Sequence, residues 1–240
     1  MWPEPLDYFG VVARRLSVVL VFGVLGAFGV HDGAAAALAT DRAVWLLDET
    51  GTPTTAVDSS GLGNHGANYN VVGNGSGYQF NGTSSRVVVA DSDSLDPGTA
   101  NFSFGVTLVM TIPPAQGETY DVLRKGLSST SGGEYKIEIK NVSGTARARC
   151  LVKDTKRVVA AIVAPTSLAD GSPHSVICSK TTGGVSVKID SLAPRTKTVA
   201  ALGSVSNTSM LALGAKAEST ASSGFDWYRG VINDAWVRVG

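Results

Sequence analysis

The chain has 240 residues, of which 20 are basic and 20 are acidic, so its formal net charge at neutral pH is zero. A nucleic-acid-binding protein normally carries a large basic excess, and this composition excludes that class. Hydrophobic residues make up 43% of the chain, and its length suits one domain with a substantial core.

Residues 1–39 show the order of features that is typical of a secretory signal peptide. An arginine pair (Arg14 and Arg15) precedes an uncharged apolar stretch over residues 16–30, and a run of alanines follows. We expect cleavage after Ala39, which would release a secreted protein with no membrane-spanning segment. The alternative is an uncleaved anchor, but about fifteen helical residues span only about 22 Å, less than the ~30 Å hydrocarbon core of a bilayer.

The remaining residues, 40–240, carry 18 basic and 17 acidic side chains, and most of this part alternates between apolar and polar residues. Such alternation predicts half-buried strands, and clusters of glycine and serine separate the runs. In chain order we expect strands within segments 44–49, 84–91, 134–140, 146–153, 158–164, 174–180, 184–190, 209–215 and 230–239. No segment after residue 40 has a helical stripe, so the sequence predicts an all-β, two-sheet antiparallel sandwich.

Several short motifs follow one another in an order that resembles laminin-G-like, concanavalin A-like jelly-roll domains of secreted bacterial proteins. They are VWLLDE (44–49), VDSSGLGNHG (57–66), FNGTSSRVVV (80–89), LRKG (123–126), LADGSPHSVICSK (168–180), VSVKID (185–190) and YRGVINDAWVRV (228–239). This sequence departs from the family pattern at Pro173, at segment 190–194 and at Asn233. The resemblance implies a jelly roll over residues 40–240 that recognises a carbohydrate or an extracellular partner.

The segment GLGNHG, Gly61 to Gly66, has the letters of a dinucleotide-binding loop. Such a loop binds pyrophosphate only between a buried strand and a helix N-terminus. Turn-forming residues precede this segment, and further glycines and asparagines follow it. We therefore interpret it as a tight turn in which glycine adopts positive φ.

Cys150 and Cys178 are the two cysteines of the chain. In an exported protein an isolated pair forms a disulfide most simply. Without a histidine partner close in sequence, the pair is a poor zinc site. We predict a Cys150–Cys178 disulfide.

The sequence offers little catalytic machinery. Glu134 and Glu138 share a strand face with Lys136, which we expect on the solvent side, and they do not match the paired-carboxylate strand of jelly-roll glycosidases. His65 and His174 come without a nucleophile elbow, and we interpret them as structural. We predict that the chain is not an enzyme, with glycoside hydrolysis as the less favoured alternative.

A calcium site is a further possibility, because laminin-G-like domains often hold calcium on loop carboxylates and carbonyl oxygens. Pairing of the first and last strands would bring Asp58, Asn64 and Asp234 near one another. The alternative is an Asx-type turn at Asp58, with its carboxylate bonded to the local backbone. No cofactor is otherwise required.

Exposed aromatic side chains are candidates for stacking on sugar. Alternation in the last strand places Ala235, Val237 and Val239 inward and Trp236 outward, with Ile232 on the same outward face as Trp236. Trp227 and Tyr228, just before that strand, form a second candidate. The alternatives for Trp236 are that it only covers a neighbouring loop or that its own face of the strand is the buried one.

Six basic residues are expected to point outward from the strands: Lys136, Lys140, Arg147, Arg149, Lys153 and Lys188. They would either merge into a basic patch for sulfated glycans or belong to a solvated face shared with acidic residues. The favoured function is a secreted, non-catalytic module that binds carbohydrate or an extracellular protein. A structural or adhesion spacer is the alternative.

Overall fold

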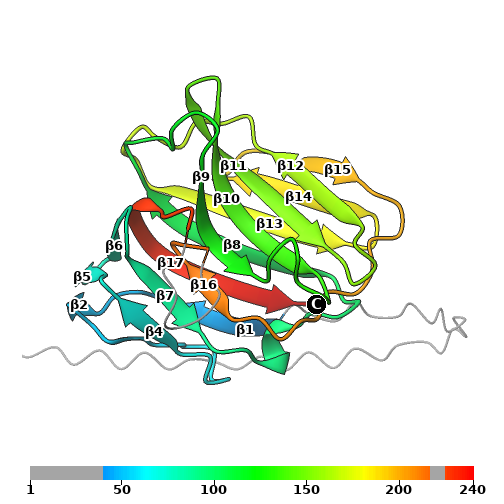
Figure 1. Ribbon diagram of the computed structural model, residues 1–240, viewed down its shortest axis with the longest axis horizontal. Coiled ribbons are helices and arrows are strands. Elements are labelled where there is room, and N and C mark those ends of the chain that lie inside the picture. Colours follow the sequence, from blue (N-terminus) through cyan, green and yellow to red (C-terminus); the bar gives the residue numbers. More distant parts are fainter. Residues whose placement is uncertain (1–39, 217–224) are drawn as a thin grey trace, which may run out of the picture. The chain divides into compact units, whose positions relative to one another are not determined.

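A computed structural model describes residues 40–216 and 225–240; the predicted signal peptide, residues 1–39, lies outside them. The described chain forms two antiparallel sheets that pack face to face, with nine strands in sheet A and eight in sheet B (Figure 1). The regular helical structure in these residues is one 3₁₀ turn, η1 (Asp93–Leu95). The all-β antiparallel sandwich predicted from the alternation is confirmed.

Sheet A has β17 near its centre, paired with β8 on one edge and with β6 and β1 on the other. Its spatial order is β15 (Arg195–Thr198), β14 (Gly184–Ile189), β13 (His174–Thr181), β8 (Phe102–Val109), β17 (Arg229–Val239), β6 (Tyr78–Asn81), β5 (Val72–Asn74) and β2 (Thr50–Gly51), with β1 (Thr40–Trp45) beside β17.

Sheet B covers sheet A from the other side of the core. Its spatial order is β12 (Val159–Val163), β11 (Thr145–Lys153), β10 (Glu134–Val142), β9 (Thr119–Lys125), β16 (Leu211–Leu213), β7 (Arg86–Val89), β4 (Gly66–Tyr69) and β3 (Thr55–Ala56).

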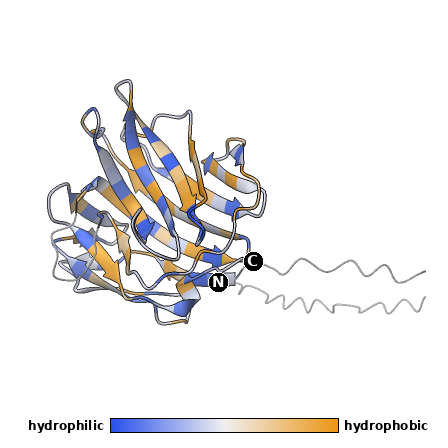
Figure 2. Cartoon of the chain, turned by 45° about the vertical axis from the view of Figure 1, so that its right-hand side comes forward, coloured by the Kyte–Doolittle hydropathy of each residue, from blue (hydrophilic) through white to orange (hydrophobic). Residues whose placement is uncertain are grey.

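The core lies between the two sheets, where the inward side chains of both meet. Hydrophilic and hydrophobic residues alternate along the strands, as expected for half-buried β-structure (Figure 2). Tyr135 of β10 packs with its ring centroid 5.3 Å from that of Phe102 and 5.0 Å from that of Phe104, both on β8. Its hydroxyl donates to the Leu95 carbonyl of η1, so the buried polar atom is satisfied.

A disulfide joins the sheets through this core, as predicted. Cys150 of β11 and Cys178 of β13 are both fully buried, with their Cα atoms 5.6 Å apart. The bond therefore links a strand of sheet B to a strand of sheet A.

Two irregularities in register change which face a residue occupies. In β17, Ile232 pairs with Leu108 while Asp234 pairs with Thr107, so Asn233 is an extra residue. Such a β-bulge resets the alternation. Ile232 is therefore buried, and the prediction that it shares the outward face of Trp236 was wrong.

A second bulge lies in β9, where Leu123 pairs with Ile137 and Asp121 pairs with Glu138. Val122 is the extra residue.

In the described residues, no helix is long and apolar enough to cross a membrane.

Candidate functional site

A hollow of about 400 Å³ opens where β6 ends, β9 begins and the chain enters β17. We call it the rim hollow. It is lined by Asn81, Gly82, Thr83, Glu118, Thr119, Tyr120, Phe225, Asp226, Trp227 and Arg229. Its volume lies within the range typical of small-ligand sites.

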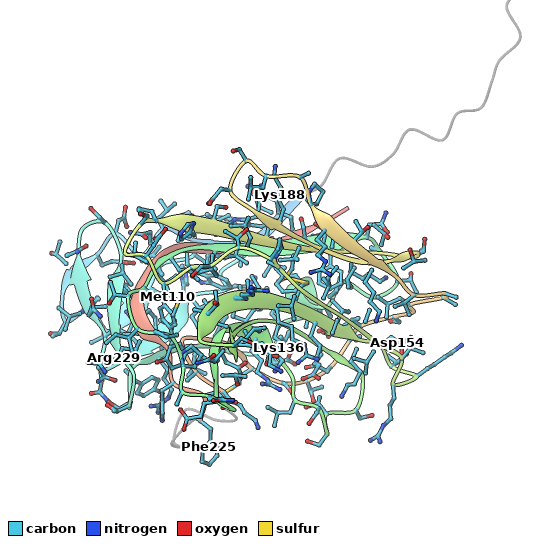
Figure 3. The ribbon with its side chains drawn as sticks, turned by 90° about the horizontal axis from the view of Figure 1, so that it is seen from above. Met110, Lys136, Asp154, Lys188, Phe225 and Arg229 are labelled. Carbon is cyan, nitrogen blue, oxygen red and sulfur yellow. A yellow bond between two sulfur atoms is a disulfide. The ribbon has the colours of Figure 1, made fainter. Side chains whose placement is uncertain are left out.

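The aromatic wall of the rim hollow comes from the segment that leads into β17. Phe225 is 64% exposed, the highest value among the exposed large hydrophobic side chains of the described residues. Its backbone N–H and C=O pair with those of Lys216, which fixes the base of the segment. Trp227 is half-buried beside it, and Figure 3 places Phe225 and Arg229 at the periphery of the domain.

Tyr228 does not reach the rim hollow. Its side chain is fully buried, and its hydroxyl donates to the carbonyl oxygens of Val109 and Val231 at 2.9 and 3.2 Å. Its ring packs against Phe80 and Tyr120. The hypothesis that Tyr228 contacts a ligand is therefore not supported, because its side chain is buried in the core, whereas Trp227 lines the hollow.

Polar side chains around the rim hollow retain free hydrogen-bonding capacity. Among the contacts of the described residues, the carboxylate of Glu118 and the guanidinium of Arg229 have no ion pair or hydrogen bond. The stem of Arg229 lies over Gly82, whose φ of +78° forms the turn after β6. Burial raises the pKa of Tyr120 although the nearby Arg229 charge opposes this rise.

Sequence reasoning had selected Trp227 alone from this set. Tyr120 was missed because it lies more than 100 residues before Trp227 in the chain. Phe225 and Arg229 were missed although they flank Trp227 in the sequence. The run FDWYR, residues 225–229, carried the one local signal, a cluster of aromatic residues outside the alternating strands.

Trp236 lies on the outer face of sheet A, as the alternation predicted, and is half-buried. A side chain on Gly105, its partner on β8, would meet the indole at 2.6 Å, so the ring lies against bare backbone. The Arg238 guanidinium lies 4.4 Å from the ring centroid and also bonds Asp41 at 2.5 Å. Nine residues of extended chain, about 30 Å, separate Trp236 from Trp227, so the two do not form one site.

Asp58 and Asn64 do lie together, in a turn network. The Asp58 carboxylate accepts hydrogen bonds from the backbone N–H groups of Val44, Ser60 and Asn64 and from the Ser60 hydroxyl. Burial favours a higher pKa for Asp58, but these hydrogen bonds outweigh it and the pKa is lowered. This geometry is that of the Asx-type turn.

Asp234 is separated from that turn by a strand. Trp45 of β1 pairs with Ala235 on one side and bridges Asp58 on the other, which puts the two backbones about 10 Å apart. Within residues 40–216 and 225–240, no three acidic, histidine or cysteine side chains gather as metal ligands. The three residues therefore do not form one cluster, and calcium binding stays a prediction.

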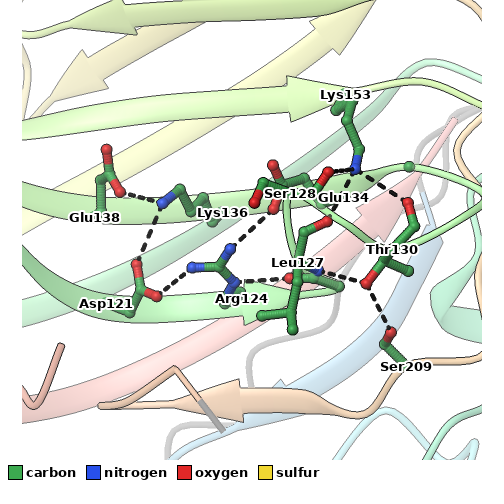
Figure 4. A network of polar contacts seen from close by, with 12 residues as sticks. Asp121, Arg124, Leu127, Ser128, Thr130, Glu134, Lys136, Glu138, Lys153 and Ser209 are labelled. Carbon is green, nitrogen blue, oxygen red and sulfur yellow. Dashed lines mark hydrogen bonds and ion pairs between the residues drawn. The ribbon is translucent and has the colours of Figure 1, made fainter. Parts of the chain in front are cut away.

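The outer face of sheet B holds a buried charged cluster of Asp121, Arg124, Glu134, Lys136 and Glu138 (Figure 4). The half-buried Arg149 joins this cluster through Glu138. Arg124 bonds Asp121 at 2.5 Å and Glu134 at 3.0 Å. Glu138 pairs with Lys136, and also with Arg149 at 2.5 Å. The expectation that these strand residues are freely solvated was wrong, because oppositely charged neighbours on adjacent strands cover one another.

Within this charged cluster, the pKa values of two carboxyl groups are shifted in opposite directions. Burial raises the pKa of Asp121 despite the charges of Arg124 and Lys136. Burial also acts to raise the pKa of Glu138, but Lys136 and Arg149 outweigh it and lower that pKa. Four residues along a strand put the backbones of Glu134 and Glu138 about 13 Å apart, and both carboxylates are held in ion pairs, Glu134 with Arg124 and Glu138 with Lys136 and Arg149.

The six basic residues do not merge into one patch. Lys136 and Lys153 are buried, and the Lys153 ammonium donates to three carbonyl oxygens, of Leu127, Ser128 and Thr130 (Figure 4). Lys188 lies on sheet A, on the opposite side of the domain from Phe225 (Figure 3).

Both histidines of the described chain have structural partners. Nδ1 of His65 accepts from the Asp58 backbone N–H at 3.0 Å. His174 lies between two carboxylates, with Nδ1 2.9 Å from Asp190 and Nε2 3.1 Å from Asp170. Burial lowers the pKa of His174, but the two carboxylates outweigh it and the pKa is raised.

Comparison with known proteins shows which solved structures have a similar fold. No protein-family model matches the chain, and no curated protein is significantly similar to it in sequence. Similar solved structures include the binding domain of botulinum neurotoxin serotype G (12% identity, TM-score 0.56) and domains LG4-5 of the mouse laminin α1 chain (13%, 0.51). A third is the Trypanosoma rangeli sialidase in complex with sialic acid (14%, 0.51).

The matches cover 83%, 69% and 81% of this chain and 46%, 43% and 30% of those structures, respectively. The chain thus spans less than half the length of each. All share the two-sheet sandwich, so this chain has the laminin-G-like, concanavalin A-like jelly-roll fold that its motifs indicated.

Proposed function

We propose that this chain is an extracellular recognition module that binds carbohydrate at the rim hollow. The observation that carries the proposal is the exposed ring of Phe225 beside Trp227, next to Glu118 and Arg229, whose side chains have no ion pair or hydrogen bond among the described residues. Sugar rings present apolar C–H faces that pack on aromatic rings, and hydroxyls that bond to such polar groups. The buried disulfide agrees with an oxidising, extracellular location.

The solved structures with a similar fold give general support to a role in binding. One is described as a neurotoxin binding domain and another as a sialidase bound to sialic acid. Recognition of an extracellular molecule is compatible with both. A spacer role and glycoside hydrolysis are the competing functions, and a glycan array distinguishes both of them from carbohydrate binding.

The test is a glycan array probed with the purified wild-type protein, Trp227→Ala and Phe225→Ala. Each variant should weaken binding about tenfold or more, the effect of losing an aromatic anchor worth 1.4 kcal/mol or more. Val159→Ala is the matched control, because Val159 is 50% exposed on β12 and far from the hollow in the fold.

Binding that survives both aromatic substitutions would place the site elsewhere. Absence of binding to every glycan would favour the spacer role. Release of reducing ends from a bound glycan, abolished in Glu134→Gln or Glu138→Gln, would instead support hydrolysis.

A further inference from the structure

The two outer faces of the sandwich differ in chemistry. The outer face of sheet B carries the long, charged side chains described above. The outer face of sheet A carries short hydroxyl side chains on four adjacent strands: Ser103, Thr107, Ser175, Ser179, Thr181, Ser186, Thr196 and Thr198.

Strand register aligns four of these hydroxyls in a straight line across the sheet. Ser103 of β8 pairs with Ser179 of β13, Ser179 with Ser186 of β14, and Ser186 with Thr196 of β15. We call this line the hydroxyl row. Neighbouring strands are about 4.8 Å apart, so the row is about 14 Å long.

The hydroxyl row has its hydrogen-bonding capacity free. None of its four side chains has a hydrogen bond to another group among the contacts of the described residues. Each hydroxyl supplies one donor and two acceptors, and all four are at least partly exposed.

A small hollow of about 130 Å³ borders the hydroxyl row at its β14–β15 end. Its lining includes Thr181, Thr198, Gly184 and residues of the row. Gly184 has φ +140°, and a Cβ there would meet the Lys197 carbonyl oxygen at 2.1 Å, so this position requires glycine.

A second cross-strand line runs beside the row and is largely apolar. Trp236 pairs with Gly105, and Gly105 pairs with Ile177 of β13. Because Gly105 has no side chain, the indole lies low over the sheet, which keeps the face flat. Arg238 pairs with Ser103 and continues the hydroxyl row on β17, where it forms an ion pair with Asp41. Lys188 pairs with Ile177 and continues the second line on β14.

We propose that the outer face of sheet A binds an extended, neutral polysaccharide chain laid across the strands along the hydroxyl row. Hydroxyls of the row would exchange hydrogen bonds with sugar hydroxyls, while C–H faces of the sugar contact Ile177 and the indole edge of Trp236. The row bears no charge, which matches a neutral chain and gives no advantage to an anionic one. This surface is distinct from the rim hollow and does not depend on it.

The test is affinity electrophoresis of the native protein in gels that contain hydroxyethylcellulose, xyloglucan, galactomannan, laminarin or dextran, with alginate as the anionic comparison. Ser179→Lys/Ser186→Lys inserts long charged side chains into the row. Ser179→Thr/Ser186→Thr keeps the hydroxyls, and Thr145→Lys places the same change on the outer face of sheet B. Circular dichroism melting of each variant verifies the fold.

We expect at least one neutral polysaccharide to retard the wild-type protein, with Kd raised at least tenfold by the lysine pair. The threonine pair, Thr145→Lys and Trp227→Ala should be retarded like the wild type. Mobility unaffected by every neutral polysaccharide, or equal retardation of the lysine pair, would overturn the proposal. So would a dimer in sedimentation that the lysine pair dissociates, because the face would then be an interface between copies. Since Trp227→Ala tests only the rim hollow, the two proposals fail separately.

Discussion

Arg124 Nη1 lies 2.5 Å from Asp121 Oδ2 on the outer face of sheet B, although strand residues three positions apart ordinarily face opposite sides. The bulge at Val122 makes this pair possible, because the extra residue turns Asp121 to the side of Arg124. The pair is buried, and it connects to Lys136 and Glu134 in the same cluster.

Removing one partner of this pair should therefore be costly. Asp121→Ala leaves Arg124 and Lys136 with less compensation for their burial, and we expect a loss of about 3–5 kcal/mol in the free energy of unfolding. Urea denaturation measures it. Asp41→Ala breaks the exposed pair with Arg238 and should cost only about 0–1 kcal/mol. Similar small losses in both variants would show that the cluster does not act as a buried network.

The disulfide should stabilise the fold chiefly by restricting the unfolded chain. The bond closes a loop with a sequence separation of 28, for which the chain-entropy model gives about 3–4 kcal/mol. Cys150→Ala/Cys178→Ala should lose that amount in urea unfolding, and the denatured, unreduced wild type should titrate no free thiol. Identical unfolding midpoints with and without reductant would contradict this expectation.

His174 should make the stability of the protein depend on pH. Its folded-state pKa is raised above the ordinary value of 6.5, so its contribution is complete below that value and is lost as the pH rises through the folded pKa. The melting temperature should therefore fall across this range in the wild type and much less in His174→Gln. His65→Gln is the control. An equal slope in His174→Gln would assign the pH dependence to other groups.

Gly105 should tolerate no side chain. A Cβ there would lie 2.6 Å from Trp236 Cζ2, so Gly105→Ala must displace the indole, at a cost of about 1–3 kcal/mol. Tryptophan fluorescence should change in parallel with stability. Gly183→Ala, whose Cβ would meet nothing closer than 3.8 Å, should leave both unchanged. A neutral Gly105→Ala would mean that the indole does not lie against the sheet.

The turn at Asp58 gives a test for calcium. Asp58→Ala orphans several hydrogen-bond donors and should destabilise the fold by about 1–3 kcal/mol. We expect this loss to be the same in calcium and in chelator, because the carboxylate is already occupied by the protein. A wild-type melting temperature that rises with calcium, and no longer rises in Asp58→Ala, would establish a metal site instead.

The sequence by itself determined most of the long strands and their inward faces, although β8 and β9 were not among the expected strands. The alternation of Tyr135, Ile137 and Ile139 predicts burial because period two is the geometry of any strand with one face in a core. The same logic placed Trp236 outward correctly. It failed at Ile232, because the bulge at Asn233 inserts one residue that the sequence pattern does not reveal.

Only the tertiary structure decided what the outward residues do. Glu134, Lys136 and Glu138 look like a solvated face in sequence, yet Arg124 and Asp121 from β9 and Arg149 from β11 cover them with opposite charge. The rim hollow and the hydroxyl row likewise join residues from separate strands. Alternation tells which side of a sheet a residue occupies, but sheet order and register, set by long-range pairing, choose its neighbours.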